Sequence, residues 1–156
     1  MISFNAANHR FNLRAAAIFL QGNSVLLHRL EGDSIWALPG GRVESGEDAA
    51  SAVVREMLEE VAERVQCGEL LYVVENFFEH QSQSQHEIGL YFFAHLEPES
   101  PMRVSSHSHF GVESNSRLEF RWFPRSELSQ VNLHPSFLRA ALAKQNLVFE
   151  HVVHRQ

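Results

Sequence analysis

Four glutamates gather on one face of a helix that we expect between residues 47 and 65. An α-helix turns by about 100° per residue, so Glu59 and Glu60 fall on either side of Glu56, and Glu63 falls almost over it. Carboxylates at this spacing repel one another, and the cluster therefore needs a compensating charge. Several oxygen ligands suit a hard divalent cation, which we expect to be Mg²⁺, with Mn²⁺ as the alternative.

Two neighbouring features favour a binding site over a merely solvated acidic surface. Arg55 lies within the cluster and can hold a carboxylate through two hydrogen bonds. Gly40 and Gly41 form a Pro-Gly-Gly turn before the helix, where the missing side chains allow a ligand to approach the backbone. The opposite helix face is apolar and is expected to pack on a sheet; it consists of Ala50, Val54, Met57, Leu58, Val61 and Val65.

The spacing resembles the signature of the Nudix hydrolases, G-x5-E-x7-R-E-U-x-E-E-x-G-U, in which U is a bulky apolar residue. The matching residues here are Gly41, Glu47, Arg55, Glu56, Met57, Glu59 and Glu60. The late glycine of the signature is replaced by Ala62, and its last apolar position by Glu63. Because a glycine commonly ends a helix in a left-handed turn, Ala62 predicts that this helix continues, as far as Gly68.

This resemblance implies metal-dependent hydrolysis of a diphosphate linkage in a nucleoside diphosphate derivative. Candidate substrates are a nucleoside triphosphate, ADP-ribose, a dinucleoside polyphosphate and a nucleotide sugar. The residues implied to carry the chemistry are Glu47, Arg55, Glu56 and Glu59, with Glu47 and Arg55 orienting the cluster. The implied metal ligands are Glu56, Glu59, Glu60 and the carbonyl of Gly40. The glutamate that matches Glu56 is a ligand or the general base, depending on the family member.

Substrate specificity resides outside the signature. We expect a further acidic residue from a later segment, with Glu113 and Glu119 as candidates and Glu87 as a weaker one. Each of these is otherwise a surface residue. A ring that stacks on a base is expected at Trp36 or Phe78, with core packing as the alternative role. The rings of Phe77 and Trp122 are further candidates.

Length and composition limit the function classes. The chain has 156 residues, 44% hydrophobic and 21% charged, which is typical of one globular domain spanning residues 1–156. The net charge of −6 argues against a surface for DNA or RNA, so the expected partner is a small nucleotide. The single cysteine, Cys67, and the lack of a signal peptide or membrane-spanning run predict a cytoplasmic protein. A homodimer is compatible with the sequence but not demonstrated by it.

The apolar runs and turn residues predict a mixed order of strands and helices. Strands are expected at 14–20, 25–30, 35–38, 70–78, 88–96, 118–123 and 147–153, with the first two forming a hairpin. Helices are expected at 47–65, with Ser45 as N-cap, and at 135–144. Residues 97–113 form a long loop. Two helices on opposite faces of one sheet predict an α/β/α sandwich with a mixed β-sheet, the fold that the Nudix resemblance also implies.

Two other functions remain open. A Nudix-fold module can sense a nucleotide without cleaving it, but such modules typically lose the signature carboxylates, and Glu56, Glu59 and Glu60 are all present. A cap-removing RNA enzyme is opposed by the acidic charge and by the lack of a basic patch interleaved with aromatic residues. The sequence therefore favours the hydrolase.

Overall fold

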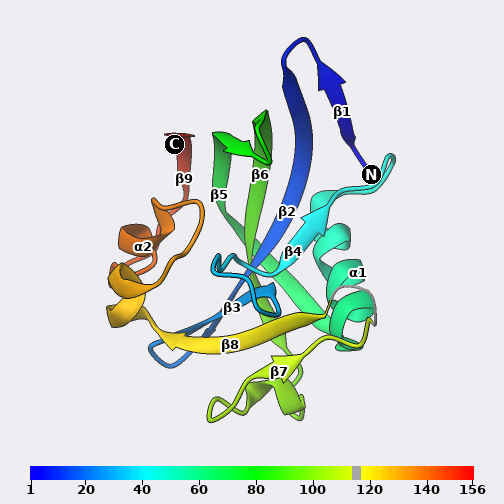
Figure 1. Ribbon diagram of the computed structural model, residues 1–156. Coiled ribbons are helices and arrows are strands. Elements are labelled where there is room, and N and C mark those ends of the chain that lie inside the picture. The colour runs from blue at the N-terminus through cyan, green and yellow to red at the C-terminus, as the bar shows by residue number, and fades with distance from the viewer. Residues whose placement is uncertain (114–116) are drawn as a thin grey trace.

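The structure is a computed structural model that describes residues 1–113 and 117–156, and in it a mixed sheet separates two layers (Figure 1). The strand order is β7-β8-β3-β2-β6-β5-β9, and β1 and β4 pair with β2 off this path. The β2–β6 and β5–β9 pairs are parallel, whereas the other strand pairs are antiparallel. The strands are β1 (Ser3–Ala6), β2 (His9–Gln21), β3 (Ser24–Leu30), β4 (Gly40–Arg42), β5 (Val65–His80), β6 (Gln83–Leu96), β7 (His109–Phe110), β8 (Leu118–Pro124) and β9 (Glu150–Arg155).

Helices α1 (Ala49–Val61) and α2 (Leu138–Ala141) lie on opposite faces of the sheet (Figure 1). One apolar core lies between the sheet and α1, and a second lies between the sheet and the segment that contains α2. The predicted three-layer arrangement with a mixed sheet is therefore confirmed. No helix in the described part of the chain is long and apolar enough to span a membrane.

Most predicted strands are present, but two of the predicted elements are much shorter. The segment 35–38 is not a strand: Trp36 and Ala37 form only isolated bridges, to Leu133 and His28. The helix predicted at 135–144 is reduced to the four residues of α2. The loop at 97–113 includes one 3-10 turn, η1 (Pro101–Arg103), and the short strand β7, and a second 3-10 helix, η2 (Arg125–Gln130), follows β8.

Helix α1 differs from the prediction at both ends. The predicted N-cap Ser45 is wrong, because Asp48 accepts a hydrogen bond from the backbone N of Ser51 at 2.8 Å and caps the helix. The predicted continuation to Gly68 is also wrong. Ala62 adopts the left-handed conformation, with φ 58°, and its N–H bonds to the carbonyl of Leu58. Alanine thus takes the backbone conformation that favours glycine, and the helix ends where the signature glycine would end it.

Replacing Ala62 by glycine is expected to stabilise the protein by about 1 kcal/mol, because glycine occupies the left-handed region without steric cost. The gain is reduced by the greater freedom of glycine in the unfolded chain. Urea unfolding of wild type and Ala62→Gly measures the difference. The matched control is Ala50→Gly inside α1, which should destabilise by a similar amount. Equal destabilisation by both substitutions would contradict this account of the helix end.

The buried face of α1 is rotated from the predicted one. The buried side chains are Ala52, Val53, Met57 and Val61, whereas Leu58, predicted to be buried, is 49% exposed. As a result, Glu56 and Glu60 lie at the border between helix and sheet and are partly buried. The carboxylate cluster is therefore not on the fully solvated side of the helix, and desolvation affects its chemistry.

Candidate active site

Arg55 holds three of the signature carboxylates. Its Nε and Nη2 atoms donate to the two carboxylate oxygens of Glu47, at 2.8 and 3.0 Å. Its Nη1 atom donates to Glu56 at 2.9 Å and to Glu59 at 3.2 Å. The hydrogen bonds with Glu47 are the largest cause that raises the pKa of Arg55, and they lower the pKa of Glu47. The guanidinium therefore supplies positive charge within the cluster and orients its carboxylates.

Glu60 is in a different electrostatic environment from the other signature carboxylates. Its Oε2 atom is buried and has no hydrogen-bond partner among the described residues. Burial first, and then the hydrogen bond and the charge of Glu56, raise the pKa of Glu60 from 4.5 to about 9, whereas the charge of Arg14 opposes the rise. A buried carboxylate oxygen without a donor is costly. Either a proton or a cation would remove this cost.

The two glycines of β4 allow protein atoms to approach one another closely. A Cβ at Gly41 would lie 2.3 Å from the carboxyl carbon of Glu56 and 2.5 and 2.6 Å from its oxygens. A Cβ at Gly40 would lie 2.1 Å from the carbonyl oxygen of Ala15 on β2. Both glycines are thus needed for the packing of α1 and β2 on β4. The role predicted for the Gly40 carbonyl as a ligand stays a prediction.

The Gly41→Ala substitution is expected to displace the Glu56 carboxylate, since the new Cβ cannot lie 2.3 Å from it. We expect the free energy of unfolding to fall by about 1–3 kcal/mol, as for other overpacked sites. A double-mutant cycle measured by urea unfolding tests the cause. In a Glu56→Ala background, the same substitution at Gly41 should have little effect. An equal loss in both backgrounds would show that Glu56 is not what the Cβ meets.

The carboxylates of α1 have the donor chemistry that a hard divalent cation requires. Glu56, Glu59 and Glu60 offer only oxygen atoms, the donor type that Mg²⁺ prefers, and one buried oxygen of Glu60 has no partner in the described part of the chain. In residues 1–113 and 117–156, no three His, Cys, Asp or Glu side chains already form a metal-binding group. Glu56 and Glu59 are instead hydrogen-bonded to Arg55. The donor chemistry therefore fits, and the side chains would reorient on binding.

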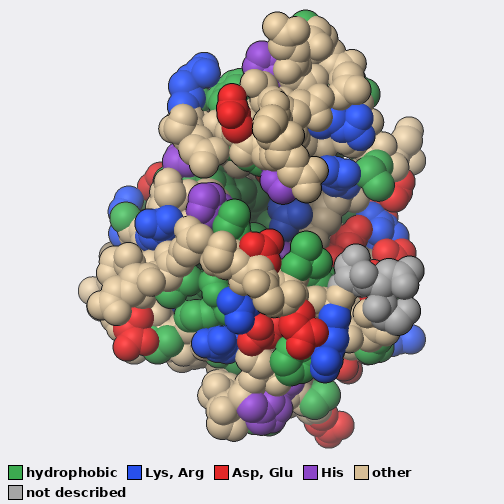
Figure 2. All heavy atoms as spheres, in the orientation of Figure 1, with side chains coloured by type: hydrophobic (Ala, Val, Ile, Leu, Met, Phe, Trp, Pro, Cys, Tyr) green, Lys and Arg blue, Asp and Glu red, His purple; other side chains and the backbone are tan. Residues whose placement is uncertain are grey.

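A pocket of about 480 Å³ opens on the sheet face opposite to α1. Figure 2 shows a hollow on this side of the molecule with histidine and arginine side chains around it. The lining comes from β2, β3, β4, β5, β6, β9 and the segments at 30–38 and 134–138. Its size suits a nucleoside-sized group.

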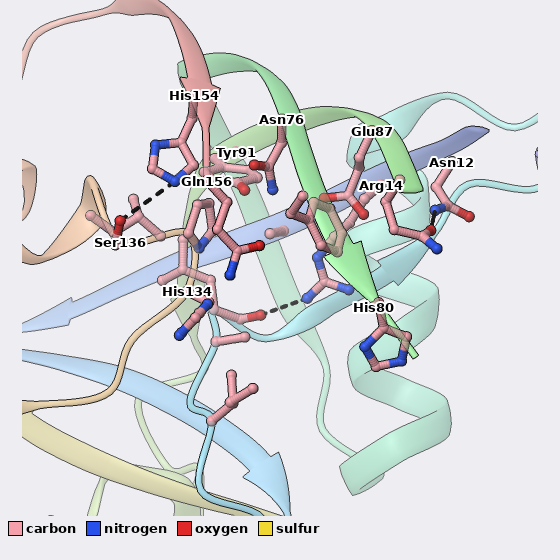
Figure 3. A pocket seen from close by; sticks show the side chains of 18 of the residues that line it. Asn12, Arg14, Asn76, His80, Glu87, Tyr91, His134, Ser136, His154 and Gln156 are labelled. Atoms are coloured by element: carbon pink, nitrogen blue, oxygen red, sulfur yellow. Dashed lines mark hydrogen bonds between the residues drawn. The ribbon is translucent and has the colours of Figure 1, made fainter. Parts of the chain in front are cut away.

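Arg14 connects this pocket with the carboxylate cluster. It lines the pocket, and its Nη2 atom donates to the carbonyl of Leu38 at 2.8 Å (Figure 3). Its charge also acts on Glu60 of the cluster and on Glu87 of the pocket. Arg42 lines the same pocket, and its carbonyl accepts a hydrogen bond from Arg55. A substrate could therefore have its phosphates at the cluster and the attached group in the pocket.

The two aromatic residues assigned to the substrate lie in different places. Phe78 lines the pocket. Trp36 is 6% exposed, packs edge to face on Phe123 at 4.8 Å between centroids, and is not among the lining residues. The guanidinium of Arg29 lies 4.5 Å from the centre of the Trp36 ring. Trp36 thus occupies the core role that was its alternative in the sequence.

The two later acidic candidates also separate. The charge of Glu113 raises the pKa of Glu60, and the adjacent Val112 donates its N–H to the Glu60 carbonyl at 2.8 Å. The segment before β8 thus brings Glu113 to the cluster. Glu119 instead forms an ion pair with Arg29 at 2.9 Å and accepts a hydrogen bond from Ser108. This ion pair accounts for Glu119 without a substrate.

Sequence reasoning missed the polar side chains of the pocket floor, chiefly Asn12, Arg14, Asn76 and His154, and rated Glu87 as weak. All of these residues line the pocket. One signal was present in the sequence: Asn12 and Asn76 interrupt strands that are otherwise rich in apolar residues. A polar residue in such a strand either packs poorly or binds something.

Comparison with known proteins agrees with the family resemblance of the sequence. The family model described as NUDIX domain matches residues 11–145. The chain is similar to the crystal structure of a NUDIX hydrolase from Nitrosomonas europaea, with TM-score 0.65, 23% identity and coverage of 93% of this chain and 79% of the other. For the MutT NUDIX hydrolase from Burkholderia pseudomallei these values are 0.65, 24%, 87% and 98%. These similarities show that the chain shares the fold of these proteins.

A curated relative from Wolbachia pipientis wMel, named RNA pyrophosphohydrolase, is 46% identical over 41 residues. This match covers 26% of the chain and spans about a quarter of the relative's length (25%). It is a local similarity.

Proposed function

The chain belongs to the NUDIX hydrolase family, and we propose that it hydrolyses a phosphoanhydride bond in a small nucleoside diphosphate derivative with the help of a divalent cation. Family membership supports pyrophosphohydrolase chemistry on nucleotide phosphoanhydrides in general. Support for this particular arrangement comes from the position of the pocket, which Arg14 and Arg42 connect to the carboxylate cluster.

In this proposal, Glu56, Glu59 and Glu60 hold Mg²⁺ or Mn²⁺, and the Gly40 carbonyl is a further candidate ligand. A bound cation neutralises phosphate charge and lowers the pKa of water. Arg55 and Glu47 keep the carboxylates oriented through the hydrogen bonds described above. Glu56 either binds the cation or acts as the general base, because a carboxylate can donate an oxygen to a cation or accept a proton from water.

The observation that carries the proposal is the buried oxygen of Glu60, which has no hydrogen-bond partner among residues 1–113 and 117–156. A solvated acidic surface would leave each carboxylate in contact with water. The negative charges of Glu56 and Glu113 oppose ionisation of the buried Glu60. A bound cation would offset this repulsion and stabilise the ionised carboxylate. Glu113 is therefore a candidate to assist the cation site.

A nucleotide sensor is the alternative within the same fold. A substrate panel with Mg²⁺ or with EDTA tests the two. The panel contains nucleoside triphosphates, oxidised nucleotides, ADP-ribose, dinucleoside polyphosphates, nucleotide sugars and 5′-triphosphate RNA, with release of phosphate or nucleotide as readout. Cleavage of one small-molecule class only with the cation supports the hydrolase. Binding without cleavage of any member would support the sensor, and cleavage of RNA alone would contradict the small-nucleotide assignment.

A further inference from the structure

A row of polar side chains crosses the floor of the pocket on four adjacent strands. In the strand register, Glu87 on β6 is the partner of Asn12 on β2 and of Asn76 on β5. Asn76 is in turn the partner of His154 on β9. All four side chains line the pocket, and Figure 3 shows them around it. We call Asn12, Glu87, Asn76 and His154 the polar row.

Two buried polar groups of the pocket have an atom without a protein partner. Asn76 is 5% exposed, yet its Oδ1 atom has no hydrogen-bond partner in the described structure. His28, another pocket residue, is 8% exposed and has an unpartnered Nδ1 atom. Asn12, by contrast, donates to Gln85 at 3.0 Å and is satisfied by the protein. Both unpaired atoms are themselves buried, in residues at the edge of the cavity. Since buried polar groups are normally paired, these are the groups of the pocket that a ligand would satisfy, after a small shift of the side chains.

The row offers mainly acceptors. A Glu87 carboxylate accepts hydrogen bonds and donates none. Burial raises the pKa of Glu87, but the charges of Arg14 and Arg42 and a hydrogen bond from Asn76 oppose the rise. That bond uses the Asn76 amide nitrogen as a donor to Glu87 and leaves the buried Asn76 oxygen as an unpaired acceptor. A ligand that satisfies both side chains must present neighbouring donors.

We propose that the polar row selects the substrate, by binding an attached organic group that presents neighbouring hydrogen-bond donors. This inference rests on the proposed function, because it assigns the pocket to the group next to the phosphoanhydride. The amino–imino edge of a base such as guanine has this chemistry, and so does the diol of a sugar. The walls formed by Leu38, Phe78 and Leu138 are apolar and favour a flat ring.

Calorimetric binding of GMP, IMP and ribose 5-phosphate in the presence of Mg²⁺ tests this inference. None of these ligands contains a phosphoanhydride, so the measurement does not depend on hydrolysis. IMP lacks the exocyclic amino group of GMP, and ribose 5-phosphate lacks the base but keeps the diol. We expect GMP to bind at least about tenfold more tightly than IMP. Equal binding of ribose 5-phosphate and GMP would assign the row to the diol instead.

The variants Asn76→Leu and Glu87→Gln are both expected to weaken binding of the preferred ligand by about tenfold or more. Glu87→Gln preserves the shape of the side chain, so it remains informative if Asn76→Leu folds poorly. The control Asn5→Leu removes an exposed amide on β1, outside the pocket, and should bind as wild type does. Wild-type affinity in both row variants would overturn the inference while leaving hydrolysis intact. Row-dependent binding without hydrolysis would overturn the proposed function alone.

Discussion

The Glu60→Gln variant is expected to be more stable than the wild type in EDTA and yet to lose its response to Mg²⁺. In the cation-free protein, burial and the neighbouring Glu56 disfavour the ionised Glu60 carboxylate. A glutamine carries no charge, and its amide can donate to Glu56. Because the wild-type carboxyl must take up a proton on folding at pH 8, we expect the free energy of unfolding of Glu60→Gln to be higher by about 1–3 kcal/mol.

The pH dependence has a definite sign. The folded-state pKa of Glu60, about 9, lies above the pKa of 4.5 that is usual for a glutamate. Its contribution to stability is therefore complete below about pH 4.5 and is lost as the pH rises through 9. Urea unfolding in EDTA between pH 5 and pH 9 should show a widening gap in favour of Glu60→Gln. The exposed residue Glu69 provides the control. The difference in stability between Glu69→Gln and wild type should not change with pH.

With Mg²⁺ the order is expected to reverse. A cation at 100 times its dissociation constant stabilises the folded state by about 2.7 kcal/mol, and this gain requires the carboxylate. The wild type should therefore gain stability with Mg²⁺, whereas Glu60→Gln should gain little. If Mg²⁺ stabilised both proteins equally, Glu60 would not be a ligand.

The second large effect is expected for Arg55→Met. This substitution keeps the length of the apolar stem but removes the donors to Glu47, Glu56 and Glu59. The arginine side chain is 25% exposed, so solvent screens part of the interaction, and we expect a loss of about 2 kcal/mol in EDTA. Hydrolysis should fall at least about 100-fold, because the carboxylates lose their orientation.

Mg²⁺ is expected to restore part of the stability that Arg55→Met loses, because the metal ion and the Arg55 guanidinium neutralise the same carboxylates. Unfolding in EDTA and in Mg²⁺ measures this restoration. The control is Arg64→Met, an exposed arginine beyond the end of α1, which should change stability by no more than about 0.5 kcal/mol. If Arg55→Met lost the same free energy of unfolding with and without Mg²⁺, Arg55 would not act on the carboxylates that bind the cation.

The carboxylate cluster was predictable because its geometry is local. One helix contains Arg55, Glu56, Glu59 and Glu60, so residue spacing alone determines which side chains are neighbours. The helix end was not predictable in the same way. Ala62 lacks the freedom of glycine, yet its φ of 58° and the hydrogen bonds of its N–H to the carbonyls of Leu58 and Met57 show that it adopts the left-handed turn.

The pocket floor was harder to predict because it depends on strand register. Asn76 and Glu87 face each other across the β5–β6 hairpin, whereas Asn12 and His154 are far away in the chain and join them only when β2 and β9 align with β6 and β5. The sequence contains no local pattern that links them. For Trp36, the sequence did not distinguish two roles, because an aromatic residue near the signature can bind substrate or belong to the core. The structure shows that it packs against Phe123.

The rate of hydrolysis of the best substrate in the panel, measured against Mg²⁺ concentration for wild type and Glu60→Gln, tests the central claim most directly. The wild type should show saturable Mg²⁺-dependent turnover that EDTA abolishes. The variant should lose about 1,000-fold or more, in line with the several kcal/mol that a catalytic cation supplies. Turnover that is independent of Mg²⁺, or undiminished in folded Glu60→Gln, would contradict a cation-dependent reaction at the α1 carboxylates.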